Sequence, residues 1–410
     1  MSEGSGTEEW PALREVTHDP VPVIVSRDDY LDAVAAIESG HGPIAVDAER
    51  ASGFRYSQRA YLIQIYRRGA GTFLFDPLPI GDFGELQQVI GPIEWVLHAA
   101  SQDLACLREV GLDPELIFDT ELGARLLGLP RVGLGTVVAD LLGIHLAKEH
   151  SAADWSTRPL PQAWLDYAAL DVEFLVDLRD IVAERLDAAG KTTIALQEFA
   201  AVRDRAEKPV AAEPWRRLSG LHTLRSARAL AVARDLWLAR DQLGRETDIA
   251  PGRLIPDRAI LAVAHAMPAS KAELLGMAEF TGRASRSSVD LWWAAVERGL
   301  ATSDPPELRA RSTTLPPPRS WAERNPEADA RLKSARAAVI EKAEQLELPV
   351  ENLLSPEALR QLAWSPPSPV TAAAIADELR GLGARPWQVQ NTADLIAQAF
   401  TDAAQPAVET

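Results

Sequence analysis

The stretch Pro43-Ile44-Ala45-Val46-Asp47-Ala48-Glu49 decides the fold prediction, because an apolar run ends there in two acids one residue apart. Residues 44–46 are apolar on both faces of an extended chain, which is typical of a central strand covered on both sides. Side chains alternate along a strand, so Asp47 and Glu49 point the same way. Their repulsion would be relieved by a hard cation such as Mg²⁺ or Mn²⁺. An ordinary strand that runs into an acidic turn is the simpler alternative.

Length and composition indicate a multidomain protein without disulfides. The chain has 410 residues, of which 47% are hydrophobic and 25% charged, as in ordinary globular proteins. Its one cysteine, Cys106, excludes an intramolecular disulfide and a cysteine zinc cluster, which fits a reducing compartment. The acidic N-terminus lacks the features of a signal peptide, and no run reaches the roughly 18 apolar residues of a membrane span. We therefore predict a cytoplasmic protein with no membrane partner.

Apolar periodicity predicts an α/β domain followed by all-α modules. Up to about residue 190, strands come first in hairpin succession and then alternate with helices, which predicts one mixed sheet with helices on both faces. After Gly190 only helices are predicted, in two segments whose loosely shared pattern indicates a duplicated module. We divide the chain into a disordered tail (1–20), an α/β catalytic domain (21–205), a first helical module (213–300), a proline-rich linker (301–319) and a second helical module (320–403).

The predicted elements near the two acids are short and well separated. A hairpin joins strands at 61–66 and 72–75, and a further strand covers 95–98. The predicted helices in this domain cover 27–39, 83–90, 101–110, 120–127, 134–142 and 162–186.

Three further residues are candidates to meet Asp47 and Glu49. Asp103 follows a predicted strand and lies in a first helical turn, where an acid also suits the helix dipole. Tyr167 and Asp171 are four residues apart in a predicted helix and share one face, which apolar neighbours bury in part. A buried acid and phenol need partners. A helix-terminal acid and a Tyr–Asp pair at a helix surface are the simpler alternatives.

Taken in order, these residues resemble the DEDD superfamily of 3′→5′ exonucleases. Tyr167 is typical of its DEDDy branch, since the sister branch has a histidine five residues before the last acid, where this chain has Asp166. The amino-acid sequence around the acids is similar to that of the bacterial ribonuclease D family at His98–Asp103, Asp119-Thr120 and Lys148–Leu160. The resemblance covers about residues 20–190 and implies a ribonuclease H-like mixed sheet with flanking helices.

The resemblance implies two-metal-ion hydrolysis. Asp47, Glu49, Asp103 and Asp171 would hold two divalent ions, Mg²⁺ or Mn²⁺, and Tyr167 would orient the attacking water. A phenol of ordinary pKa, about 10, is a poor general base at neutral pH, so activation would rest mainly on the metal. The expected partner is RNA with a free 3′ end, such as a tRNA precursor, which a monomeric enzyme would shorten by releasing nucleoside 5′-monophosphates.

The first helical module resembles an HRDC domain, which implies nucleic-acid binding. The resemblance lies in residues 221–225, 255–257, 267–268 and 273–275. Although the whole chain has a net charge of −17, which argues against unselective nucleic-acid binding, residues 215–258 hold nine arginines and five acids, a local charge of +4. The arginines are Arg216, Arg217, Arg225, Arg228, Arg234, Arg240, Arg245, Arg253 and Arg258. The second helical module resembles a degenerate copy with more acid and less arginine.

Four cations are candidate nucleic-acid contacts: Arg225 and Arg228 in the helical module, and Lys148 and Arg158 beside the catalytic acids. Each could equally be an ordinary surface charge.

Two other functions stay open. A DNA 3′→5′ exonuclease of the proofreading class shares the catalytic residues, although no polymerase domain follows. A catalytically inactive nucleic-acid-binding scaffold is disfavoured by the complete set of acids.

Overall fold

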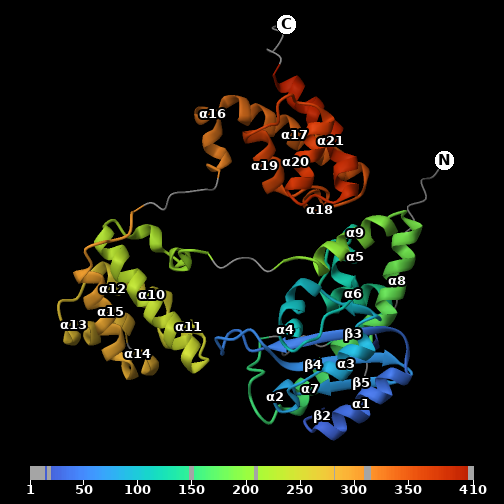
Figure 1. Ribbon diagram of the computed structural model, residues 1–410, viewed down its shortest axis with the longest axis horizontal. Helices are drawn as coiled ribbons and strands as arrows, with labels where there is room; N and C mark the ends of the chain where they lie inside the picture. Colours follow the sequence, from blue (N-terminus) through green and yellow to red (C-terminus); the bar gives the residue numbers. More distant parts are fainter. Residues whose placement is uncertain are drawn as a thin grey trace.

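A mixed six-stranded sheet forms the centre of the N-terminal domain in the computed structural model, which describes residues 14–15, 20–146, 152–206, 211–280, 282–308 and 315–404 (Figure 1). The strand order is β2-β5-β4-β3-β6-β7, so β3 is central. β3 pairs antiparallel with β4 and parallel with β6, as predicted for a mixed sheet. The strands are β2 (Val23–Ile24), β3 (His41–Arg50), β4 (Ala60–Arg68), β5 (Gly71–Phe75), β6 (Glu94–Leu97) and β7 (Leu116–Asp119).

Two antiparallel ladders, β4 with β5 and β3 with β4, set the register of the site face. Gly69 and Gly71 have φ values of +82° and +96°, a left-handed conformation that glycine adopts without strain. The separate ladder between β3 and β4 places Gln64 opposite Asp47 and Leu62 opposite Glu49. Because directly opposed residues share a face, Asp47, Glu49 and Gln64 lie on the same side of the sheet.

Helices cover both faces of this sheet, as predicted. On one face Tyr30 and Phe83 pack edge-on against Phe75, which places α1 and α3 there. On the other face α7 buries Leu165 and Ala168 with Leu62 and Leu74 of β4 and β5. The helices of this domain are α1 (Arg27–Ser39), α2 (Pro77–Ile80), α3 (Gly84–Ile90), α4 (Leu104–Glu109), α5 (Thr120–Leu126), α6 (Leu134–Leu142), α7 (Gln162–Glu173), α8 (Leu175–Ala188) and α9 (Thr192–Arg203).

Three predicted elements differ from the structure. The helix expected at 101–110 is a 3₁₀ turn (Ala100–Gln102) followed by α4, with Asp103 between them. The helix expected at 162–186 divides at Phe174 into α7 and α8. The tail expected to be disordered contains β1 (Arg14–Glu15), which pairs with β8 (Ile144–His145). A backbone ladder forms without an apolar side-chain pattern, so composition did not reveal this short strand.

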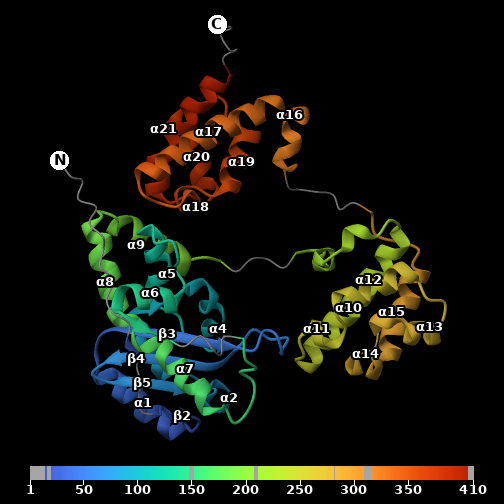
Figure 2. The same ribbon diagram turned by 180° about the vertical axis from the view of Figure 1, so that it is seen from behind.

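Two helical bodies follow the sheet domain (Figures 1 and 2). The first has its own core around Leu236, Ile260 and Trp292. Its helices are α10 (Ala227–Thr247), α11 (Pro251–Leu254), α12 (Asp257–Ala266), α13 (Lys271–Gly276), α14 (Arg283–Ser287) and α15 (Val289–Ala301). The second comprises α16 (Trp321–Arg324), α17 (Pro326–Gln345), α18 (Val350–Leu353), α19 (Pro356–Trp364), α20 (Ala372–Gly381) and α21 (Pro386–Ala403). None of the helices among the described residues has the length and apolarity to cross a membrane.

Candidate active site

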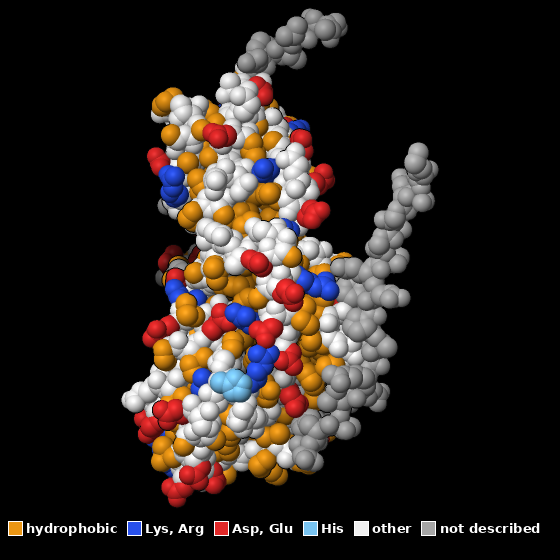
Figure 3. Space-filling view, turned by 90° about the vertical axis from the view of Figure 1, so that its right-hand side faces the viewer, with side chains coloured by type: hydrophobic (Ala, Val, Ile, Leu, Met, Phe, Trp, Pro, Cys, Tyr) orange, Lys and Arg blue, Asp and Glu red, His pale blue; other side chains and the backbone are white. Residues whose placement is uncertain are grey.

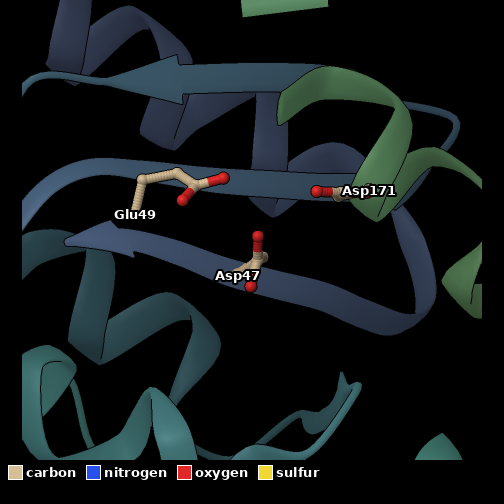
Figure 4. A group of neighbouring side chains, drawn as sticks. All are labelled: Asp47, Glu49 and Asp171. Carbon is tan, nitrogen blue, oxygen red and sulfur yellow. The ribbon is translucent and has the colours of Figure 1, made fainter. Parts of the chain in front are cut away.

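Three carboxylates meet above the end of β3. Asp47 and Glu49 extend from β3, and Asp171 reaches them from α7, which crosses the same face of the sheet (Figure 4). One carboxylate oxygen from each residue lies within 4.8 Å of the others. The alternation along β3 and the crossing of α7 therefore bring together acids that are more than 120 residues apart in the sequence.

Asp103 lines the same pocket but stands outside this group of three. The pocket has a volume of about 640 Å³ and is also lined by His98 and Tyr167. Asp103 is only 6% exposed, and although it precedes α4, its side chain makes no capping hydrogen bond to that helix. A role as an ordinary helix cap therefore does not account for this buried acid.

Asp119 fixes the turn that presents Asp103. Its buried carboxylate accepts hydrogen bonds from the backbone N–H groups of Ala99 and Ala100, at 3.1 and 2.9 Å, and also caps α5 through the N–H groups of Glu121 and Leu122. Ala99 has φ of +64°, an unfavourable value for a residue with a Cβ, so the turn needs such support. The sequence showed Asp119 only as part of the family resemblance, without this role.

The electrostatics of the pocket favour a bound cation. Burial, followed by repulsion from neighbouring acids, raises the pKa of Glu49, Asp103 and Asp171 well above the ordinary values, and burial also raises the pKa of Asp47. Arg50 lowers the pKa of three of these groups through its charge, but one cation does not balance four acids. A donor set made only of carboxylate oxygens fits Mg²⁺ or Mn²⁺. The residues present therefore fit the divalent ions that the resemblance implies.

Tyr167 is a neutral hydrogen-bond donor in this pocket. It lies one helical turn before Asp171, to which its hydroxyl is hydrogen-bonded. Burial and the charges of Asp171 and Glu49 raise its pKa beyond the ordinary value for a phenol. His98 is also neutral, because burial lowers its pKa to about 4. Neither side chain carries charge at neutral pH, so both can orient groups without competing with a cation.

The four predicted nucleic-acid contacts have different surroundings. Lys148 lies outside the described residues. Arg158 donates to Asp76 at 2.5 Å and to the Tyr61 carbonyl at 2.8 Å, so its guanidinium links its own segment to β4 and to the N-cap of α2. Arg228 donates to the Thr302 carbonyl, and Arg225 is exposed. Contact with RNA stays a prediction for all four.

Sequence reasoning missed that the first helical module also contacts the pocket. Gly53 and Phe54 line the pocket in the loop after β3. Arg253 of α11 donates to the Gly53 carbonyl at 2.8 Å, and its guanidinium lies 3.9 Å from the centre of the Phe54 ring. The backbone N–H of Ala250 donates to the Phe54 carbonyl. No periodic pattern predicts such contacts, because they depend on one arginine side chain and on single backbone groups of a loop.

Family models match three successive parts of the chain. A 3′-5′ exonuclease model matches residues 22–187, an HRDC domain model matches 229–296, and a model described as a 3′ to 5′ exonuclease C-terminal domain matches 314–400. The predicted likeness of the first helical module to HRDC is thereby confirmed. The second helical module is matched by a different model, and its proposed likeness to HRDC stays a prediction.

Relatives and solved structures agree with this assignment. Ribonuclease D of Granulibacter bethesdensis is 32% identical over 84% of this chain and 86% of its own length, and that of Escherichia coli is 31% identical over 61% and 68%. A protein from Bifidobacterium adolescentis matches 96% of this chain and 100% of its own, with TM-score 0.86 and 36% identity. The E. coli RNase D structure, described as an exoribonuclease involved in structured RNA processing, matches 88% and 99%, with TM-score 0.65 and 25% identity. The chain thus belongs to the ribonuclease D family of 3′-5′ exonucleases.

Proposed function

We propose that this exonuclease shortens RNA from its 3′ end and releases nucleoside 5′-monophosphates, with tRNA or other structured-RNA precursors as substrates. The observation that carries the proposal is the meeting of Asp47, Glu49 and Asp171 within 4.8 Å, beside the buried Asp103. Relatives named ribonuclease D support RNA as the substrate.

The four acids are proposed to hold two divalent ions, Mg²⁺ or Mn²⁺. Bound there, such ions supply an activated water and stabilise the leaving 3′ oxygen. Asp47 and Glu49 stand on a rigid central strand, while Asp103 and Asp171 approach from separate helical elements. The strand therefore holds two of the metal ligands in fixed positions, and Asp103 and Asp171 supply the other two.

Tyr167 and Arg50 are proposed to act on the substrate. The neutral hydroxyl of Tyr167 is held beside Asp171, where its oxygen would accept a hydrogen bond from the attacking water and so orient it. Arg50 lines the same pocket and brings a positive charge to its wall, which would contact the backbone phosphate. Binding and orientation would therefore come from uncharged and cationic groups, and metal ligation from the acids.

The part of the RNA that lies outside the active site is proposed to contact the first helical module (213–300), which contains the HRDC domain. Arg225 is exposed there and forms no ion pair within the described part of the chain. On the face shown in Figure 3, basic and acidic side chains are interspersed, with no broad basic area. Contacts through a few arginines of the helical module therefore fit a chain of net charge −17 better than a broad basic surface would.

Incubation of 5′-labelled RNA carrying a single-stranded 3′ extension tests the proposal. With Mg²⁺ or Mn²⁺ we expect a ladder that shortens from the 3′ end, and with EDTA no cleavage. A substrate blocked at its 3′ end is the control for polarity. Faster cleavage of the matching DNA would favour the DNA exonuclease, and RNA binding without cleavage in either metal would favour the inactive scaffold.

A further inference from the structure

Gln64 is a fully buried polar side chain in the middle of the apolar strand β4. It is 0% exposed, and neither its amide nitrogen nor its amide oxygen has a hydrogen-bond partner. It is the only side chain in the described ranges for which two buried polar atoms both lack partners. An unmade hydrogen bond at a buried group costs about 1–3 kcal/mol, so an unsatisfied amide of this kind needs an explanation.

The sheet register places this amide beside a proposed metal ligand. Gln64 is paired with Asp47 of β3 on one side and with Leu74 of β5 on the other. Directly opposed side chains of an antiparallel pair have Cβ atoms about 4.5–5.5 Å apart, which is within reach of a glutamine amide. The same face is covered by α7, the helix that carries Tyr167 and Asp171. The side chain of Gln64 therefore lies next to that of Asp47, in the layer between the sheet and α7, the helix that completes the site.

We infer that Gln64 is a positioning residue whose amide N–H group donates to the carboxylate of Asp47 in the metal-loaded site. The inference rests on the proposed metal-dependent function. A carboxylate that ligates a cation keeps lone pairs for an outer donor, and such donors fix the orientation of the ligand.

The chemistry of an amide suits this position better than the alternatives. A lysine or arginine here would compete with the metal ions for the carboxylates. Another acid would add a further negative charge beside four carboxylates that already line one pocket. A neutral donor orients Asp47 without changing the charge of the site. The unsatisfied amide is then a group prepared for the loaded state.

Gln64→Met tests this role because it removes the amide at nearly constant volume. Leu74→Met is the matched control, since Leu74 is the other cross-strand neighbour of Gln64 and is also 0% exposed. Binding of Mn²⁺ alone is measured by calorimetry without RNA, and thermal unfolding is measured in EDTA. We expect Gln64→Met to bind Mn²⁺ about 10- to 100-fold more weakly than the control. In EDTA it should unfold at the same temperature as wild type or higher, because two unsatisfied groups are gone.

The outcomes separate this inference from the proposed function. If wild type binds Mn²⁺ and Gln64→Met binds it as tightly as the control, the positioning role is overturned while the metal site stands. If Gln64→Met lowers the unfolding temperature in EDTA and leaves Mn²⁺ affinity unchanged, Gln64 is a core residue. If wild type binds no Mn²⁺, the proposed function itself fails. Gln64→Leu serves as the second variant if methionine prevents folding.

Discussion

The two helical modules are attached to the catalytic domain in opposite ways. The HRDC domain is held by polar contacts to the loop that follows β3, where Asp248 accepts hydrogen bonds from the Ser57 backbone N–H at 2.8 Å, from Arg59 at 3.1 Å and from the Tyr61 hydroxyl at 3.2 Å. Gly244 permits the close approach, because a Cβ there would lie 2.9 Å from the Tyr56 ring. In Figures 1 and 2, α11 lies beside this loop of the sheet domain.

The C-terminal module instead shares a hydrophobic core with the catalytic domain. Buried residues of both belong to one continuous cluster. Glu198 of α9, 5% exposed, receives two hydrogen bonds from Arg385, at 2.5 and 2.6 Å, and one from the Trp387 indole at 2.7 Å. The ammonium of Lys191 bridges the carbonyls of Leu126 and Glu347, one in each part. Both ribbon views show this module beside the α9 side of the catalytic domain.

The two kinds of attachment indicate different roles: the C-terminal module is structural, and the HRDC domain contacts the candidate active site. Apolar burial fastens the C-terminal module, so its removal would expose a core face. The HRDC domain keeps its own core and touches the wall of the active-site pocket through Gly53 and Phe54. We therefore expect changes at the first attachment to act on stability, and changes at the second to act on turnover.

The largest expected effect is the loss of stability in Arg385→Ala. This change leaves the buried carboxylate of Glu198 without its cation, which costs about 3 kcal/mol of unfolding free energy. Urea unfolding followed by circular dichroism measures it. Arg380→Ala is the matched control, because the Arg380–Asp377 pair of the same module is exposed and should contribute within about 0.5 kcal/mol. Equal stability of the two variants would contradict the assigned attachment.

A smaller effect, on turnover, is expected for Asp248→Asn. Asp248 has φ of +50°, which asparagine also tolerates, so the helix end survives while the charge and one acceptor atom are lost. A looser loop would mis-set Gly53 and Phe54 at the pocket. We expect kcat/KM to fall about tenfold on short and long RNA alike, which corresponds to about 1.4 kcal/mol.

Asp290→Asn is the control for this prediction. Asp290 is an exposed acid of the same domain that pairs with Lys271 of α13 and not with the loop after β3. Its kcat/KM should equal that of wild type. A defect of Asp248→Asn that is confined to long RNA would show that the contact serves RNA binding and not the pocket wall.

The smallest effect is expected for Arg225→Glu. The exposed arginine would lose its phosphate contact, so the slope of log affinity against log salt should fall by about 0.7 for single-stranded RNA. Cleavage of a short oligonucleotide should not change. Arg298→Glu, an exposed arginine in the last turn of α15, is the control for added negative charge. Identical slopes for wild type and Arg225→Glu would remove Arg225 from the RNA contacts.

The sequence was sufficient to place the candidate site residues on their strand and helices, but not to predict which parts of the chain enclose the pocket. Asp47 and Glu49 could be placed on one face because strand periodicity is strict, and Tyr167 and Asp171 because helical spacing is. The strand Leu62-Ile63-Gln64-Ile65 did carry a signal, since a lone amide in an apolar run is anomalous. The attachments of both helical modules have no periodic signature. A chain cut near residue 205 would lose the cover that the C-terminal module gives to α9.

The central claim is that Asp47 and its neighbouring acids carry metal-dependent hydrolysis. Asp47→Asn preserves size and removes the charge, and the measurement is release of nucleoside 5′-monophosphate from 3′-labelled RNA across a Mg²⁺ or Mn²⁺ titration. We predict metal-dependent release by wild type, none above background by Asp47→Asn, and unchanged circular dichroism. In EDTA, Asp47→Asn should unfold at the same temperature as wild type or higher, because a buried repulsive charge is gone. Near wild-type release by a well-folded Asp47→Asn protein would contradict the account.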